Sequence, residues 1–338
     1  MNASNKNVIN VTPLKASEYF NGIISGNRVS LSRAITLIES SLEKHQAMAR
    51  ELVELCLPYS GNSIRIGITG APGAGKSTFI DSFGSYLTSH NKKVAVLAID
   101  PSSSKAKGSI LGDKTRMDRL AIDPSAFIRP SPSSGSLGGV AKTTRETIIL
   151  CEAAGFDFII VETVGVGQSE IAVHSMVDFF LLIMIAGAGD ELQGIKRGIM
   201  EMADAIAINK ADGDNLTKAK AARAEFSHAL HLFPPSESGW VPRVETCSAL
   251  SDMGIDNIWK IIEEHHLAAV TKGYFDFNRE QQSIFWMYDT ITENLKSSFF
   301  NQQKIKDALP LFERKIKDKT ISSYAAAVEL LELFKNRK

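Results

Sequence analysis

Apolar and polar residues form alternating blocks along most of the chain. Short and nearly continuous apolar runs, typical of buried β-strands, occupy residues 64–69, 93–99, 126–129, 156–161, 179–186, 205–209 and 244–247. Segments with helical spacing of apolar residues, such as 77–87 and 141–154, lie between these runs. The pattern therefore predicts an α/β fold with a doubly wound, mostly parallel sheet that is covered by helices on both faces. In such a sheet, ligands bind beyond the carboxyl ends of the strands.

The region before this pattern contains no strand-like run. Residues 13–24 predict a short helix, and residues 31–57 continue with helical spacing at Ile35, Ile38, Leu42, Leu52 and Leu55. We therefore expect an N-terminal helical extension over residues 1–62, packed on an α/β domain over residues 63–267.

After about residue 267 the strand pattern stops. An apolar row follows one face of a predicted helix at Ile284, Tyr288, Ile291, Leu295 and Phe299. Pro310 is expected to open or kink a further helix, and Ser322 to cap a last helix that runs to about Lys335. Residues 268–338 thus predict a C-terminal helical arm. Its apolar row could pack against another subunit or against its own domain, and the sequence favours neither alternative.

Composition narrows the class of protein. Of the 338 residues 44% are hydrophobic, and 38 Lys and Arg balance 38 Asp and Glu. This balance removes any bulk electrostatic argument for nucleic acid or for an anionic membrane. The three cysteines form no C-x-x-C pair, the first 13 residues lack an apolar core, and the apolar run 177–188 is interrupted by Asp178. The sequence therefore predicts a soluble, cytoplasmic protein with no membrane span and no nucleic-acid partner.

The clearest chemical motif is a phosphate-binding loop. Residues 70–77 have the pattern G-x-x-x-x-G-K-S between a predicted strand and a predicted helix. Backbone N–H groups of such a loop point at phosphate oxygens, the lysine reaches the β- and γ-phosphates, and the serine hydroxyl ligates magnesium. The predicted nucleotide-binding residues are Gly70, Ala71, Pro72, Gly73, Ala74, Gly75, Lys76, Ser77 and Thr78.

A second motif predicts the base. Residues 209–212 have the pattern N-K-x-D directly after a predicted strand. The Asp212 carboxylate can accept hydrogen bonds from the guanine N1–H and exocyclic amine, and adenine offers no such donor pair. Ser248, Ala249 and Leu250 follow the next strand and can support the base from the other side. Together with Asn209 and Lys210, these residues predict GTP or GDP, and not ATP, as the ligand.

The strand at 156–161 leads into a candidate switch. Glu162 lies where most such proteins place an aspartate that holds magnesium through water, and Gly165 could donate its N–H to the γ-phosphate. Val166 occupies the position of the water-orienting glutamine in Ras-like proteins, and Gln168 follows two residues later. We therefore expect slow intrinsic hydrolysis that a partner or a conformational change accelerates.

Three further segments carry charged residues at predicted strand ends. Asp100 and Asp113 could approach magnesium or could be two solvated loop acids. Residues 188–196, which include Asp190 and Lys196, suggest another mobile switch. The adjacent His265 and His266 have no spaced partner, and we expect a structural role or a solvated position for them.

Taken together, these motifs resemble one family, the MeaB/ArgK-type GTPases, which includes the methylmalonic aciduria type A proteins. The matching motifs are the phosphate loop and residues 100–103, 112–117, 162–170, 187–194 and 209–212, and the resemblance spans roughly residues 20–335. It implies a GTPase that acts as a chaperone of an adenosylcobalamin-dependent acyl-CoA mutase, usually methylmalonyl-CoA mutase. It also implies gating of cofactor loading, protection or reactivation of the mutase, and a homodimer formed by the C-terminal helices. The resemblance implies roles for Asp100, Asp113 and Glu162 around Mg²⁺, beside Ser77 of the phosphate loop, and for Lys196 in a third switch. The expected catalytic residues are Lys76, Glu162, Gly165, Gln168 and Lys196.

Two other functions stay open. The first is a P-loop kinase of the arginine/ornithine transport type, since the loop alone permits phosphoryl transfer. The guanine motif and the several switches argue against it. The second is a metal-insertion GTPase, a class that needs a metal-capture motif, and neither a C-x-x-C pair nor a histidine-rich tract is present in the sequence.

Overall fold

A single parallel sheet forms the centre of the fold. The computed structural model describes residues 14–99, 117–130, 137–163, 169–187, 197–234 and 236–335. The strands are β1 (Ile64–Gly70), β2 (Val94–Ile99), β3 (Ala126–Arg129), β4 (Phe158–Thr163), β5 (Phe179–Ile185), β6 (Ala205–Asn209) and β7 (Arg243–Thr246). They lie in the order β3-β2-β4-β1-β5-β6-β7, and every pair is parallel. The predicted doubly wound sheet is confirmed, and it is entirely parallel.

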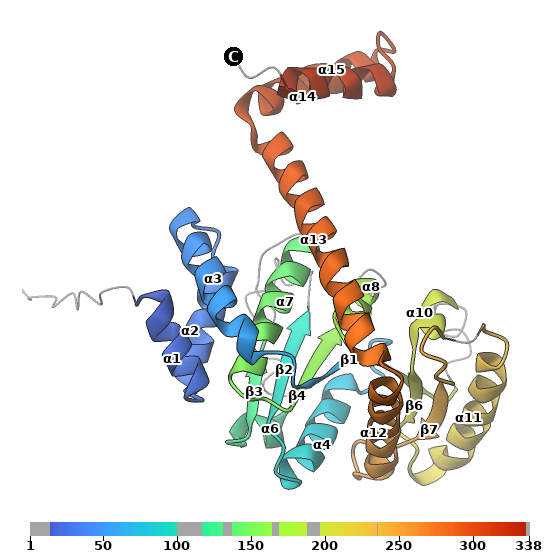
Figure 1. Cartoon of the computed structure of the whole chain (residues 1–338). Coiled ribbons are helices and arrows are strands. Elements are labelled where there is room, and N and C mark those ends of the chain that lie inside the picture. Colours follow the sequence, from blue (N-terminus) through green and yellow to red (C-terminus); the bar gives the residue numbers. More distant parts are fainter. Residues whose placement is uncertain are drawn as a thin grey trace, which may run out of the picture. The chain divides into compact units, whose positions relative to one another are not determined.

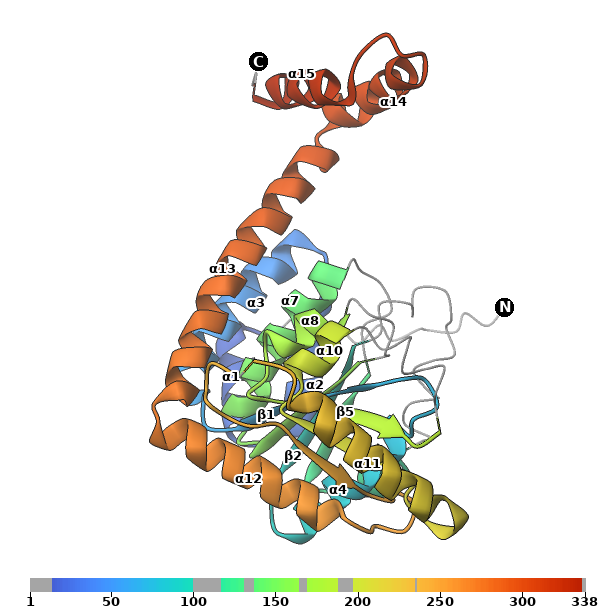
Figure 2. The ribbon, with the colours of Figure 1, turned by 90° about the vertical axis from the view of Figure 1, so that its right-hand side faces the viewer.

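Helices cover both faces of this sheet (Figure 1, Figure 2). One face carries α4 (Lys76–Ser89), α6 (Asp118–Ile122) and α12 (Ile255–Thr271). The other carries α7 (Leu137–Ala153), α8 (Ser169–His174), α10 (Arg197–Met202) and α11 (Leu216–Leu230). Because every strand runs in the same direction, the segments that follow β1, β4 and β6 leave the sheet at one edge.

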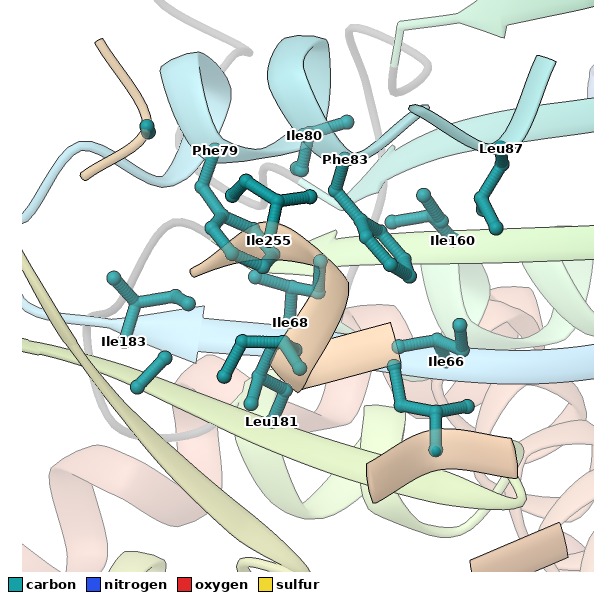
Figure 3. Packing of buried hydrophobic residues seen from close by; sticks show 14 of the residues in the cluster. Ile66, Ile68, Phe79, Ile80, Phe83, Leu87, Ile160, Leu181, Ile183 and Ile255 are labelled. Carbon is teal, nitrogen blue, oxygen red and sulfur yellow. The ribbon is translucent and has the colours of Figure 1, made fainter. Parts of the chain in front are cut away.

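The main core lies between the sheet and the helices α4 and α12 (Figure 3). Alternate strand residues such as Ile66, Ile68 and Ile160 point toward Phe79 and Phe83 of α4, and all five are 0% exposed. The two phenylalanine rings stack with centroids 5.6 Å apart. Burial of each such side chain contributes roughly 1.5–3 kcal/mol, so this core fixes the helix that begins at the phosphate loop.

The N-terminal region differs from the expected single helical stretch over residues 31–57. The structure has three helices here, α1 (Ala16–Ile24), α2 (Arg28–Glu39) and α3 (Glu43–Cys56). Ser40 interrupts the pattern, because its hydroxyl oxygen accepts a hydrogen bond from the Leu42 N–H at 3.4 Å and contacts His45 Nδ1 at 2.8 Å. Serine side chains compete in this way with helical backbone bonds. The helices pack beside α7, and Arg129 of β3 forms an ion pair with Glu39 at the end of α2.

The chain divides into two compact units, residues 1–279 and 280–338. The helix α13 (Tyr274–Asn301) runs across this division. The boundaries at residues 62 and 267, which follow the sequence pattern, remain predictions.

The second unit also contains α14 (Gln303–Lys317) and α15 (Ser323–Lys335), which pack on each other. Pro310 lies inside α14 and does not open it. The Ser322 hydroxyl accepts the Ala325 N–H at 3.1 Å, so this residue caps α15 as expected. Over the ranges that the structure describes, no helix combines the length and apolar character that crossing a membrane requires.

Candidate nucleotide site

The phosphate-loop segment joins β1 to α4 at the carboxyl end of the central strand. Gly75, directly before α4, has φ +90°, and a Cβ atom there would lie 2.6 Å from Asn209 Nδ2. A Cβ atom on Gly70 would lie 2.2 Å from the Ile183 carbonyl oxygen of β5. Only glycine fits both positions, because the loop passes so close to β5 and to the end of β6. The backbone is thus shaped by its neighbours as well as by its own sequence.

Lys76 is the cation of this loop. Its Nζ donates hydrogen bonds to the Gly70 carbonyl at 2.7 Å and to the Ala71 carbonyl at 3.2 Å, and the residue is 9% exposed. Burial lowers the pKa of Lys76, and the nearby carboxylates of Glu162 and Glu170 oppose this shift. A buried ammonium group at the mouth of a loop suits an anionic ligand, whose charge would offset the cost of burying it.

An oxygen-rich pair lies at the start of α4. The Ser77 hydroxyl donates to Glu162 Oε1 at 3.1 Å, and Glu162 is 8% exposed at the end of β4, in register with Ile68 and Ala98 of the neighbouring strands. The neighbouring Thr163 hydroxyl donates to that of Thr69 at 2.8 Å. A hydroxyl beside a carboxylate is a donor set that suits a hard cation such as Mg²⁺.

The base motif is joined to the phosphate loop by one side chain. Asn209 Nδ2 donates to the Ala74 carbonyl at 2.9 Å, and Asn209 Oδ1 accepts the Ala249 N–H at 3.1 Å. Lys210 has φ +58°, and its Cε lies 3.9 Å from the position of a Cβ atom on Gly75. The structure thus brings the segments around residues 74, 209 and 249 together, as the shared strand edge predicted.

Asp212 is supported by the loop after β7. The Ser248 hydroxyl donates a hydrogen bond to Asp212 Oδ2. Leu250 is 85% exposed at the tip of a turn, in which the backbones of Ser248 and Met253 exchange hydrogen bonds of 2.9 and 3.1 Å. The serine therefore orients the carboxylate, while the leucine side chain projects outward.

Several predicted site residues lie outside the described residues. They are Asp100, Asp113, Gly165, Gln168 and Lys196. Of the predicted magnesium ligands, the structure therefore describes Ser77 and Glu162. Within the described ranges, no group of three or more His, Cys, Asp or Glu side chains could hold a metal ion.

The structure also reveals residues near the site to which no role was assigned from the sequence. Glu170, which is 1% exposed, belongs to the matched motif 162–170, so its place in that motif was an available signal. Asp81, Ser82, Arg119 and Asp252 form a polar cluster beside the loop after β7. Arg119 and Asp252 are 133 positions apart in the chain, and no local pattern connects them.

Comparison with known proteins gives a consistent result. The family described as "Methylmalonyl Co-A mutase-associated GTPase MeaB" matches residues 31–304. The GTPase ArgK of Escherichia coli is 47% identical over 312 residues, which cover 92% of this chain and 94% of that protein. The mitochondrial methylmalonic aciduria type A homolog of Mus musculus is 44% identical over 328 residues, covering 94% of this chain and 79% of that protein.

A solved structure agrees with these relatives. The crystal structure of a "LAO/AO transport system kinase" superimposes with a TM-score of 0.77 at 39% identity, covering 96% of this chain and 100% of that chain. The match to the family extends over the α/β domain and into the helices on either side of it. This chain therefore belongs to the MeaB family of methylmalonyl Co-A mutase-associated GTPases.

Proposed function

We propose that this protein binds and hydrolyses GTP as a chaperone of an adenosylcobalamin-dependent acyl-CoA mutase, and that this mutase is methylmalonyl-CoA mutase. The observation that carries the guanine-nucleotide part is the Asn209 side chain, which joins the phosphate loop to the loop that supports Asp212. The names of the family and of its mouse relative support the mutase part. In this proposal the chaperone gates cofactor loading and protects or reactivates the mutase in the cytoplasm.

The proposed roles rest on the sequence motifs, and the contacts of Lys76, Ser77, Glu162 and Asp212 support them. Backbone N–H groups of residues 70–78, apart from Pro72, which has none, hold the phosphates. Lys76 neutralises the β- and γ-phosphate charge, and Asp212 accepts hydrogen bonds from the guanine edge. Ser77 and Glu162 would hold Mg²⁺, and Asp100 and Asp113, which lie outside the described residues, would complete its ligands. When bound, this ion neutralises charge on the phosphate oxygens.

Hydrolysis in this proposal is slow without a partner. Val166 cannot orient water through its side chain, so Gln168 or Lys196 must complete the site. A lysine on the γ-phosphate can act as an arginine finger does, an effect worth about 10³–10⁵ in rate.

The test is single-turnover GTP hydrolysis with and without the mutase. We expect the mutase to accelerate turnover in the unaltered chain. Lys196→Ala should bind GTP with unchanged affinity and lose the acceleration. Full acceleration of this variant would rule out the role of Lys196, and a fast partner-free reaction would show that Val166 is not limiting.

A second candidate is phosphoryl transfer to a small molecule or a transport protein. The similarity to a protein described as a transport system kinase favours this candidate. Incorporation of the GTP γ-phosphate into arginine, ornithine or a transport protein would support the kinase, whereas release of inorganic phosphate alone supports the GTPase.

A further inference from the structure

The loop after β7 is tied to two helices by the polar cluster of Asp81, Ser82, Arg119 and Asp252. Arg119 of α6 donates from Nη1 to both carboxylate oxygens of Asp252, at 2.9 and 3.1 Å, and from Nη2 to one of them at 3.1 Å. Its Nε donates to Asp81 of α4 at 3.0 Å, and the Ser82 hydroxyl of the same helix also donates to Asp252. The Asp252 carboxylate thus accepts hydrogen bonds from side chains of both α6 and α4.

Close packing of the two helices puts Arg119 in this place. A Cβ atom on Gly84 of α4 would lie 2.5 Å from Leu120 Cδ1 of α6, so glycine is what allows this approach. The Leu120 N–H donates to Asp81 Oδ1 at 2.9 Å, which fixes the start of α6 on α4. The guanidinium group therefore projects from a rigid base.

Asp252 itself has an unusual backbone. Its φ is +55°, a left-handed conformation that costs a non-glycine residue on the order of 1 kcal/mol. The carboxylate contacts hold Asp252 at one end of the turn over residues 248–253. At the other end, Ser248 donates to Asp212, and the Ala249 N–H donates to Asn209.

We propose that Arg119 and Asp252 are positioning residues for guanine recognition. The hydrogen bonds from Arg119 hold Asp252 and so fix the turn over residues 248–253. The first residue of this turn, Ser248, orients the Asp212 carboxylate that accepts from guanine. The helix α4 begins with Lys76 and Ser77, and its residues Asp81 and Ser82 contact Arg119 and Asp252. The same helix therefore positions the phosphate end and the base end of the site. The inference rests on the proposed guanine-nucleotide function.

The charges at the two residues agree with a positioning role. Hydrogen bonds from Arg119 and then from Ser82 lower the pKa of Asp252, so the pair stays ionised at neutral pH. The Arg119 side chain is 45% exposed and that of Asp252 is 54% exposed. Pairs this exposed contribute little to folding stability, and variants of them should therefore fold.

The experiment measures dissociation constants of GDP and IDP for the full chain by calorimetry. Hypoxanthine, the base of IDP, lacks the exocyclic amine of guanine, so the ratio of the GDP and IDP affinities reports the proposed contact with Asp212. We expect Arg119→Ala and Asp252→Asn each to weaken GDP binding by roughly 3- to 10-fold and IDP binding less, which lowers the preference. Asparagine tolerates the left-handed backbone. The double variant should be no worse than either single variant, and Arg119→Lys should recover little because lysine lacks the planar fork.

Arg243→Ala is the matched control. Arg243 pairs with Glu264 at 2.6 Å, and the two side chains are 47% and 54% exposed, much like Arg119 and Asp252. Its GDP-to-IDP preference should equal that of the unaltered chain. An unchanged GDP-to-IDP preference in both Arg119→Ala and Asp252→Asn would overturn this inference and leave the proposed guanine site intact. An unaltered chain that binds GDP and IDP equally would overturn the guanine site, and this inference with it.

Discussion

For single residues, the proposed preference for guanine depends on Asp212. It accepts a hydrogen bond from Ser248, which leaves carboxylate lone pairs for the guanine edge. Asp212→Asn replaces an acceptor by an amide donor, so the guanine donors lose their partner. We expect the affinity for GTP to fall by about 30- to 1,000-fold, or about 2–4 kcal/mol. Calorimetry with GTP, ATP and XTP would check this, and XTP should gain affinity because its C2 carbonyl can accept from the new amide. An unaltered chain with equal affinity for ATP and GTP would contradict the assignment.

A partly buried acid, Asp204, and a buried histidine, His265, lie beside β5, and we expect them to make the folding stability depend on pH. Asp204 Oδ2 accepts the Phe180 N–H at 2.8 Å, and Asp204 Oδ1 lies 3.7 Å from His265 Nε2. Burial, helped by the charge of Asp178 and opposed by the Phe180 hydrogen bond, raises the pKa of Asp204 to about 7. Burial lowers the pKa of His265 to about 4, with Asp178 opposing this shift and His266 adding to it. Between about pH 4 and 6.5 the pair therefore holds one proton in the folded chain, on Asp204, and one in the unfolded chain, on His265.

This compensation predicts opposite pH slopes in two variants. In Asp204→Asn only the unfolded chain binds the proton, so stability should fall by roughly 1–3 kcal/mol as the pH drops from 6.5 to 4. In His265→Gln only the folded chain binds it, so stability should instead fall as the pH rises over that window. Urea midpoints at the two ends of the window, compared with the unaltered chain, measure both effects. Identical slopes in all three proteins would contradict the account.

Among the helices and strands, the first turns of α13 are joined to the amino ends of the sheet strands by Arg279. It donates to the Asp178 carboxylate at 2.7 and 2.9 Å, and to the carbonyls of Gly61 and Ser63 at 2.6 Å each. Glu152, with 0% of its side chain exposed, lies 3.7 Å from Arg279 and forms a pair with Arg65 at 2.9 Å. The segment before β1, the start of β5 and the start of α13 thus meet at one network of buried charges.

Removing one cation from this network should be costly. Arg279→Met leaves the buried Asp178 carboxylate without its main charge partner, and we expect a loss of about 3–5 kcal/mol of unfolding free energy. Urea denaturation of the full chain measures this loss. Arg243→Met, at an exposed pair, should lose less than about 1 kcal/mol. Equal losses in the two variants would show that the network does not stabilise the fold.

At the scale of the whole molecule, the apolar row of α13 bears on assembly. Ile284, Tyr288, Ile291 and Leu295 are 49, 63, 47 and 62% exposed. Phe299, in contrast, packs against Phe334 of α15, with the two rings tilted by 59° and their centroids 5.2 Å apart. Contiguous exposed apolar side chains indicate a protein interface, and we propose that this row forms the homodimer contact.

The proposed dimer can be tested without shortening the chain. A truncation at residue 270 would also remove Arg279, so charge substitution in the full chain is the cleaner change. We expect Ile291→Glu and Leu295→Glu to yield monomers in sedimentation velocity at concentrations where the unaltered chain is dimeric. Ser297→Glu, on the opposite side of the helix, should stay dimeric. Dimers in all three variants would place the interface elsewhere.

Most strands and the contiguous site motifs could be predicted from the sequence. Strands such as β3 and β6 match their predicted bounds, because runs of apolar residues between turns leave a local pattern. The phosphate loop and the base motif were also predictable, since each is a contiguous segment whose chemistry depends on residue type and spacing. Their meeting at one edge followed from the parallel order of the strands, because the ends of such strands share an edge.

The contacts that hold these parts together could not be predicted from the sequence. Four features depend on contacts between side chains. They are the helix break at Ser40, the hydrogen bonds of Asn209 to two loops, the ion pair of Arg119 with Asp252 and the charge network around Arg279. Except at Ser40, the partners are far apart in the chain, so neither periodicity nor a motif connects them. The physical reason is that hydrophobic periodicity reports only the face that an element buries. The partner of a polar side chain is set by packing between elements, as at the close contact of Gly84 with Leu120.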